Sequence, residues 1–312
     1  MTMGKPRFAV SGNANLDVYL VVERIPGPDE AVEAVETRSY VGGAATNVAV
    51  ALARLGVYAR FLGFVGGDDE GARVLKELGG NGVDTGYVQM SSLPTGRVIV
   101  LLDRQGRRAM VALRGANTEL KPGCFNAESV LGGVDHLHLS STHPGYTAWL
   151  LQEAKRLGLS TSWDPGMAVV SRSPQEVLKA ARSADVLFLN EREYEALRGG
   201  LAELGETLVV VKRGEEGSEA PRLGVKVKAF RVSPVDTTGA GDTFDASFLV
   251  AWKLGLSVED CLLLGNAAGA LKVTRMGAHS SPTLRELYDF LSSRVESGEA
   301  LPRLAGLFRD LA

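Results

Sequence analysis

Apolar segments alternate with helical segments through the middle of the chain, and this alternation constrains the fold more than any other feature. The apolar runs cover residues 136–140, 160–164, 185–189 and 207–212, and the helical segments cover residues 146–157, 174–181 and 191–198. Each run is apolar on both faces, which is typical of a strand in a parallel sheet that helices cover on both sides. The pattern predicts an α/β fold with a mostly parallel, Rossmann-like sheet flanked by helices.

Further elements are expected on both sides of this region. Residues 7–11 and 60–65 have the composition of buried strands. Helices are expected at residues 48–55, 69–78, 242–253, 257–272 and 283–293. A length of 312 residues suits one large α/β domain, so we expect a single domain over residues 1–312.

Two pairs of strand-like segments do not fit the alternation. Residues 18–23 and 31–40 form the first pair, and residues 95–102 and 107–113 form the second, with no helix between the members of either pair. Such pairs predict a small antiparallel sheet, built from about residues 14–40 and 95–114 and inserted in the domain. A sheet with one apolar face needs a cover, so we expect a lid over the site, a homodimer surface, or both.

Composition and charge narrow the classes of partner. The net charge is −3 with both signs interspersed, which argues against nucleic acid or an anionic membrane as the main partner. Cys124 and Cys261 form neither a zinc spacing nor a disulfide framework, as is usual in a reducing compartment. The sequence shows no secretory leader pattern and no run of about 18 apolar residues. We therefore expect a cytoplasmic protein that acts on small molecules.

The segment from Val235 to Phe244 contains the clearest candidate for chemistry. Three small residues, Gly239, Ala240 and Gly241, precede Asp242 at the expected start of a helix. The N–H groups of such a helix start form an anion site that a ligand can approach closely. A carboxylate beside that site suits a phosphoryl group in transfer, because Asp242 can take a proton from the attacking hydroxyl. The alternative is an ordinary glycine-rich turn with an aspartate cap.

Other polar or glycine-rich segments lie where strands are expected to end. Asn13, Asn15 and Asp17 have the spacing of two that places side chains on one face of an extended segment. Gly42 and Gly43 precede a helix that carries Asn47 in its first turn, although a tight structural turn would also explain them. Later strand ends carry Asp164, Asn190, Glu193, Lys212, Gly214 and Gly217. In parallel sheets this edge is where ligands bind.

Together, in this order, these motifs resemble those of the ribokinase/PfkB carbohydrate kinases. The segment 236–242 is similar to the family's C-terminal signature, and Gly42-Gly43 with Asn47 is similar to its N-terminal one. Asn190 and Glu193 match its N-x-x-E motif, Gly214 and Gly217 its nucleotide loop, and Asn266 with residues 275–278 its adenine-side helix and loop. The resemblance covers residue 8 to about residue 285 and implies the ribokinase-like fold.

The resemblance implies transfer of the γ-phosphoryl group of ATP to a hydroxyl of a sugar or sugar derivative. Asp242 is then the general base, and the N–H groups of Gly239, Ala240 and Gly241 form the anion hole. The acceptor is expected to contact Asn15, Asp17, Gly42, Gly43, Asn47 and Asp242. ATP is expected to lie near Asn190, Glu193, Lys212, Gly214, Gly217, Gly241 and Asn266, with Glu193 ordering Mg²⁺ through water.

The resemblance also implies a monovalent cation such as K⁺ behind the anion hole. Its expected ligands are Asp236 and the Thr238 carbonyl. Two features depart from, or add to, the pattern. Ala44-Ala45 stands where ribokinase has a lysine and a glycine, which weakens a ribose assignment. Asp245 lies one helical turn after Asp242, where it either raises the pKa of the base or, more in keeping with its type, faces solvent or an arginine.

These motifs leave open which molecule accepts the phosphoryl group. Arg97 and Arg114 lie on the lid segments, and His138, Thr142 and His143 lie at a strand end expected to be near the acceptor. An arginine that points into the site would favour a phosphorylated or carboxylated acceptor, and its absence would favour a free sugar or a nucleoside. We rank a sugar, sugar phosphate or sugar acid first and a nucleoside second.

Two other classes of protein could also have a sheet of this kind. A nucleotide-binding regulator that lost its chemistry would have no use for Asp242. A dinucleotide-dependent dehydrogenase would need the G-x-G-x-x-G fingerprint, and the glycine-rich residues 66–71 lack that order. Both are therefore less consistent with the sequence than the kinase.

Overall fold

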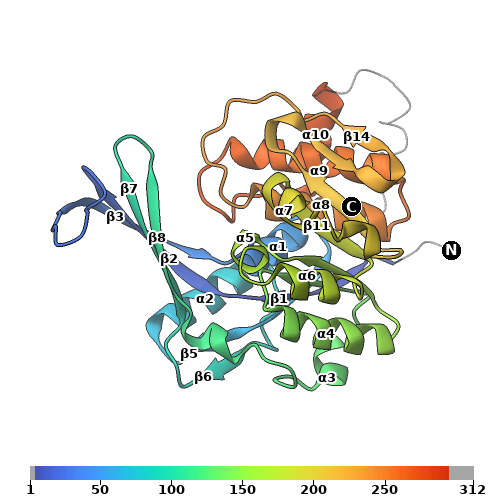
Figure 1. The fold of residues 1–312 in the computed structure, drawn as a ribbon, viewed down its shortest axis with the longest axis horizontal. Helices are drawn as coiled ribbons and strands as arrows, with labels where there is room; N and C mark the ends of the chain where they lie inside the picture. The colour runs from blue at the N-terminus through green and yellow to red at the C-terminus, as the bar shows by residue number, and fades with distance from the viewer. Residues whose placement is uncertain (1–3, 295–312) are drawn as a thin grey trace.

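The computed structural model describes residues 4–294, in which an eight-stranded sheet forms the centre (Figure 1). The strand order is β14-β13-β12-β11-β10-β9-β1-β4. The bounds are β1 (Arg7–Gly12), β4 (Tyr58–Leu62), β9 (His136–Ser140), β10 (Ser160–Asp164), β11 (Val186–Asn190), β12 (Leu208–Lys212), β13 (Ser218–Ala220) and β14 (Val225–Val227). The strands from β4 to β12 run parallel, and β13 and β14 continue the sheet antiparallel. The predicted parallel sheet is confirmed.

Helices cover both faces of this sheet and bury two apolar cores. One core packs under α1 (Ala44–Arg54), α2 (Asp69–Gly80), α8 (Ala240–Lys253), α9 (Val258–Val273) and α10 (Leu284–Arg294). The other packs under α3 (Ala127–Leu131), α4 (Pro144–Arg156), α6 (Pro174–Ala181) and α7 (Glu191–Leu197), with the short α5 (Met167–Val170) beside them. None of the helices in residues 4–294 has the length and apolarity that crossing a bilayer requires.

A second sheet of four strands extends away from the main sheet on the side of α2 (Figure 1). Its order is β3 (Ala34–Gly42), β2 (Asn15–Val22), β7 (Gly96–Asp103) and β8 (Arg108–Leu113). The two expected pairs, β2–β3 and β7–β8, are antiparallel hairpins. Their junction was not predicted: β2 and β7 pair in parallel, from Asn15 beside Gly96 to Val22 beside Asp103.

The strand expected at residues 60–65 is divided. β4 ends at Leu62, and β5 (Phe64–Gly66) leaves the main sheet to pair with β6 (Gln89–Ser91). Gly63 separates the two strands, and a Cβ there would lie 2.6 Å from the Phe61 ring and 3.0 Å from the Gly12 carbonyl. The chain therefore changes sheets at a residue that has no room for a side chain.

Candidate active site

The start of α8 has the backbone geometry that the sequence predicted for an anion site. Gly239 caps the helix with φ 78°, a conformation that favours glycine, and a Cβ there would lie 2.9 Å from the Ala278 carbonyl. The helix begins at Ala240, two residues earlier than expected. The Ala240 N–H donates to the Thr237 carbonyl at 3.2 Å, whereas no hydrogen bond recorded within residues 4–294 uses the N–H of Gly239 or Gly241. Gly239 and Gly241 are therefore the freer donors for an anion.

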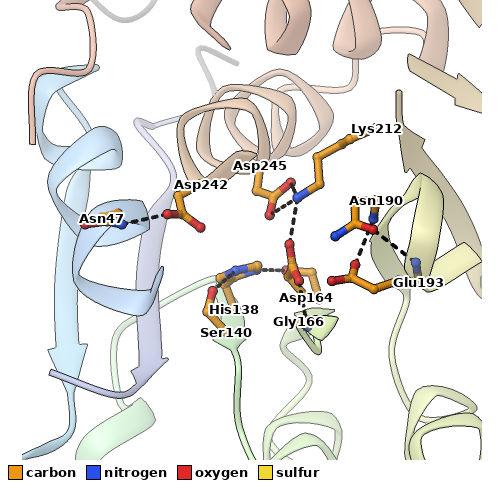
Figure 2. Close-up of polar contacts among 11 residues, drawn as sticks. Asn47, His138, Ser140, Asp164, Gly166, Asn190, Glu193, Lys212, Asp242 and Asp245 are labelled. Atoms are coloured by element: carbon orange, nitrogen blue, oxygen red, sulfur yellow. Dashed lines mark hydrogen bonds and ion pairs between the residues drawn. The ribbon is translucent and has the colours of Figure 1, made fainter. Parts of the chain in front are cut away.

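Asp242 lies in the first turn of α8 and faces α1 (Figure 2). The side-chain amide of Asn47 donates to its carboxylate at 2.7 Å. Burial raises the pKa of Asp242 to about 6, while the hydrogen bond from Asn47 acts in the opposite direction. A carboxylate with a pKa of about 6 is ionised at neutral pH and close enough to it to exchange a proton, as a general base requires.

Asp245 was expected to face solvent or an arginine, and this expectation is wrong. Its side chain is fully buried, and it accepts from the Lys212 ammonium at 2.8 and 3.0 Å. The same ammonium donates to Asp164 at the end of β10, at 2.6 Å (Figure 2). Burial raises the pKa of Asp245 well above its usual range, and Asp164 adds to this while Lys212 opposes it. This Asp164–Lys212–Asp245 cluster joins two strand ends to α8 directly beneath the turn that holds Asp242.

Lys212 also borders a cavity of about 830 Å³, which we call the α9 cavity. The cavity lies between the start of α8, α9 and the loops after β12 and β14, and it brings together the predicted nucleotide residues Lys212, Gly214, Gly217, Gly241 and Asn266. A Cβ on Gly241 would lie 3.4 Å from the Lys212 ammonium, so this charge borders the predicted anion hole. The Asn266 amide donates to the carbonyls of Val227 and Lys228 at 3.1 and 3.3 Å.

Asn190 and Glu193 do not line the α9 cavity. They cap α7 reciprocally: the Asn190 side chain accepts from the Glu193 N–H at 3.0 Å, and the Glu193 carboxylate accepts from the Asn190 N–H at 2.8 Å. Burial, and then the charge of Asp164, raise the pKa of Glu193 to about 7. Among residues 4–294 no group of three or more His, Cys, Asp or Glu side chains is arranged to hold a metal ion. A Mg²⁺ ion that keeps most of its waters needs few such ligands.

A second cavity, of about 430 Å³, lies between the four-stranded sheet and the loops 234–238 and 276–278. We call it the sheet cavity. Asp17 lines it, and a Cβ on Gly42 would lie 2.1 Å from the Asp17 carboxylate, so Gly42 leaves the space that Asp17 occupies. Burial raises the pKa of Asp17 to about 6.

Three buried oxygens near this end of the site have no hydrogen-bond partner among residues 4–294. They belong to the side chains of Asn13, Asp17 and Asn47. Buried acceptors of this kind are normally satisfied, so they indicate a ligand that brings hydroxyl donors. Asn13 was seen in the sequence as part of a polar strand end but was not placed among the acceptor residues.

Asn15 was expected to contact the acceptor, but its side chain is engaged elsewhere. Its oxygen accepts from the Asn117 amide at 2.8 Å, and Asn117 also pairs with the backbone of Ala14. The partner lies 102 residues away in the sequence, so no local pattern reveals it. Asn15 therefore ties β2 to the turn after β8.

The arginines singled out in the sequence are not those that reach the sheet cavity. Arg97 pairs with Glu70, with Nε 3.2 Å from the carboxylate, and Arg114 is exposed. Arg38 and Arg108 line the cavity instead, beside Tyr19, Tyr40 and Asp17. The Arg38 guanidinium also donates two hydrogen bonds to Glu36, at 2.6 and 2.8 Å. The alternation of side chains along β2 could have pointed to Arg38. Tyr19 is two residues after Asp17, so both lie on one face of the strand, and Tyr19 pairs with Arg38 across β2 and β3.

His138, Thr142 and His143 line neither cavity. Both ring nitrogens of His138 are held by Ser162 and Ser140 at 2.8 Å, and burial lowers its pKa to about 3, so the ring is neutral. Thr142 bonds to Thr147, and His143 caps α4. These side chains are held by partners within the protein, and their expected position near the acceptor stays a prediction.

Of the expected cation ligands, Asp236 already has partners within the protein. The carboxylate of Asp236 accepts from the N–H groups of Thr238 and Gly277, both at 2.9 Å. Its backbone carbonyl accepts from the Lys272 ammonium at 2.8 Å. This loop therefore stays in place through contacts within the protein.

Known proteins resemble this chain over nearly its whole length. The model of the pfkB family of carbohydrate kinases matches residues 5–284. An ATP-dependent ribose-1-phosphate kinase from Halopiger xanaduensis is 37% identical over 93% of this chain and 99% of its own length, and a nucleoside kinase from Methanocaldococcus jannaschii is 30% identical over 91% and 95%.

Solved structures agree with the sequence comparisons. The ribokinase of Thermotoga maritima has a TM-score of 0.82 at 31% identity and covers 92% of this chain and 99% of its own. The ribokinase of Arabidopsis thaliana complexed with ribose and ATP has a TM-score of 0.82 at 28% identity over 94% and 100%. The resemblance and the ribokinase-like fold predicted from the motifs are confirmed. The chain belongs to the pfkB family of carbohydrate kinases, phosphotransferases that act on a hydroxyl group of a sugar or sugar derivative.

Proposed function

We propose that the protein is an ATP-dependent kinase of a phosphorylated sugar. The observation that carries this proposal is the sheet cavity, in which Arg38 and Arg108 line the same space as Asp17. Unpaired carboxyl and amide oxygens lie at one end of the site, and the guanidinium groups of Arg108 and of Arg38, which also pairs with Glu36, line the cavity. This combination suits a small polyol that carries a phosphate. The name of the Halopiger xanaduensis relative, a ribose-1-phosphate kinase, supports the same class.

The α9 cavity and the sheet cavity adjoin one another, because Pro234 and Thr237 line both. We assign ATP to the α9 cavity and the acceptor to the sheet cavity. Asp242, beside the start of α8, takes the proton from the attacking hydroxyl. The free N–H groups of Gly239 and Gly241 stabilise charge on the group in transfer. The whole chain acts as one kinase domain, with the four-stranded sheet as its lid.

We also propose that the kinase uses Mg²⁺ together with ATP. Glu193 is the residue we assign to hold its waters, because its carboxyl group is buried near the charge of Asp164. Burial and this charge raise its pKa, and a nearby cation would return it to the charged form. When bound, Mg²⁺ neutralises charge on the ATP phosphates. The chain's own contribution is to fix Glu193 through the cap that it makes with Asn190.

Matched acceptors test the proposal through acceptor-dependent ADP release. We expect ribose 1-phosphate to be turned over with a much higher kcat/KM than ribose. Replacing Arg108 with alanine removes a charge-assisted hydrogen bond, so KM for the phosphorylated acceptor rises about tenfold to a hundredfold while KM for ATP is unchanged.

The matched control for Arg108 is Arg104→Ala on the same hairpin, because Arg104 is exposed, pairs with Glu23 and does not line the cavity. We expect this variant to keep the wild-type KM. Equal turnover of ribose and ribose 1-phosphate by the wild type, or an Arg108→Ala effect of the same size on both, would contradict a phosphorylated acceptor.

A nucleoside acceptor remains the second candidate because two aromatic rings line the sheet cavity. Tyr19 and Tyr40 lie edge to face with ring centroids 5.8 Å apart, a surface on which a base can pack. Nucleosides therefore belong in the same acceptor panel. A kcat/KM for adenosine or inosine above that of every sugar phosphate would favour this candidate.

We also propose a cytoplasmic homodimer that associates through the four-stranded sheet. Met110, Val111 and Leu113 on β8 are 66, 59 and 49% exposed, which leaves an apolar strand edge without a cover. Cys124 and Cys261 are both free thiols, as is usual in a reducing cytoplasm. Light scattering should give twice the mass of the chain, and the Val111→Lys variant should shift the mass towards the monomer. A monomeric wild type would contradict the dimer.

A further inference from the structure

A lysine is buried behind the predicted anion hole. Lys272 lies in the last turn of α9, and its side chain has no exposed surface. Its ammonium donates to the Asp236 carbonyl at 2.8 Å and to the Arg275 carbonyl at 3.3 Å, and lies 3.7 Å from the Asp236 carboxylate. A buried charge persists when it is paired in this way, so Lys272 is a fixed positive charge.

The ammonium joins the two loops that support the start of α8. The Val273 carbonyl accepts from the N–H of Asp236 at 3.0 Å, and the Asp236 carboxylate accepts from the N–H of Gly277. The loop 275–278 then reaches Gly239 through the close approach of the Ala278 carbonyl. Lys272 therefore lies at the junction that fixes the position of Gly239 and the residues after it.

The family resemblance assigns Asp236 and the Thr238 carbonyl to a monovalent cation, and the contacts of Asp236 do not suit one. The Asp236 carbonyl already accepts from an ammonium, and both carboxylate oxygens of Asp236 accept backbone N–H groups. A second monovalent cation on the same residue would lie within a few ångströms of the Lys272 charge, and like charges repel strongly in a buried site.

We propose that Lys272 supplies from the chain itself the single positive charge that a monovalent cation is expected to supply behind the anion hole, so that the enzyme works without K⁺. Lys272 is a positioning residue: it holds the Asp236 and Arg275 carbonyls together and places a fixed charge behind the site of phosphoryl transfer. The assignment rests on the proposed kinase function. Burial lowers the pKa of Lys272, but Asp236 and, more weakly, Asp242 favour its charged form.

The test compares K⁺ with the same concentration of tetramethylammonium, a cation too large for this site. We expect the wild type to show the same kcat in both. Lys272→Ala removes the ammonium and opens the space around the carbonyls, so kcat falls about tenfold or more, less than for a donor in direct contact. Added K⁺ then restores kcat, while KM for ATP changes little. Lys272→Met fills the space without a charge, so it loses kcat and K⁺ does not restore it.

A matched control and a second readout separate this role from simple stability. Lys253 ends α8, and its ammonium also donates to a carbonyl, that of Asp135, and to Ser160, away from both cavities. Lys253→Ala should give no response to K⁺. In a thermal melt, K⁺ should raise the unfolding midpoint of Lys272→Ala and leave that of the wild type unchanged.

Two results would overturn the assignment. One is a wild type that K⁺ activates several-fold, and the other is a Lys272→Ala variant with normal kcat and no K⁺ response. If Lys272→Ala does not fold, the wild-type comparison still decides. If the wild type turns over no acceptor, the proposed function fails, and the K⁺ effect on the thermal midpoints still tests Lys272.

Discussion

The Asp242→Asn variant is expected to bind ATP as the wild type does and to lose about 10³-fold or more in turnover, the combined effect of a lost general base and altered positioning. Asparagine has the same shape, and its amide oxygen still accepts from Asn47, which donates to Asp242 at 2.7 Å. Asp242 does not line the α9 cavity, so ATP affinity is preserved. Single-turnover transfer from labelled ATP and equilibrium ATP binding measure the two quantities separately.

A matched control isolates the role of this one carboxylate. Asp69 is also an aspartate in the first turn of a helix, α2, but it is exposed and lines neither cavity. Asp69→Asn should therefore transfer phosphate at the wild-type rate. A turnover of Asp242→Asn within a few-fold of the wild type would exclude Asp242 as the base.

The Lys212→Met variant is expected to lose about 3–5 kcal/mol of unfolding free energy, the usual cost of removing one partner from a buried ion pair. Lys212 lies 2.6 Å from Asp164 and 2.8 Å from Asp245, and Asp245 has no exposed surface. Methionine fills the space but leaves the buried carboxyl groups of Asp164 and Asp245 without their shared cation. Urea denaturation at neutral pH measures the loss.

Two companion variants locate the cause of that loss. Neutralising the carboxylates as well, in Asp164→Asn/Lys212→Met/Asp245→Asn, should recover part of the stability because no charge is left unpaired. Lys226→Met removes an exposed lysine whose partner, Glu216, lies 3.8 Å away, and should change stability by about 0.5 kcal/mol or less. A Lys212→Met loss below about 1 kcal/mol would show that the cluster is not a buried network.

Local patterns in the sequence predicted most of the fold. The alternation of strand-like and helical segments predicted the central strands β9 and β10 with their observed bounds, and the helix α6 likewise. The hairpins of the four-stranded sheet were also predicted, because each depends on neighbouring segments. The parallel pairing of β2 with β7 was not, because it joins segments that lie about 80 residues apart and no turn encodes it.

In the candidate site, too, features that depend on neighbouring residues were predicted and contacts between distant segments were not. Motifs within a few residues of each other, such as Gly239 to Asp242, predicted the start of α8 to within two residues and five residues of the α9 cavity. Contacts between distant segments were not readable. The pairing of Lys212 with Asp245 becomes visible only when the end of β12 is placed against α8. That of Lys272 with Asp236 becomes visible only when the end of α9 is placed against the loop before α8.

The pH dependence of single-turnover phosphoryl transfer tests the role of Asp242 most directly. Because burial raises its pKa to about 6 and the base must be ionised, the rate should be constant near neutral pH and fall about tenfold per unit as the pH drops below 6. Asp17 also has a pKa of about 6, so the Asp17→Asn variant is measured beside the wild type at saturating acceptor.

We expect the acid limb to persist in Asp17→Asn and to disappear in Asp242→Asn, whose low rate no longer depends on pH between about 5 and 8. An acid limb that survives in Asp242→Asn, or a wild-type rate that stays constant down to about pH 5, would contradict the assignment of Asp242 as the general base.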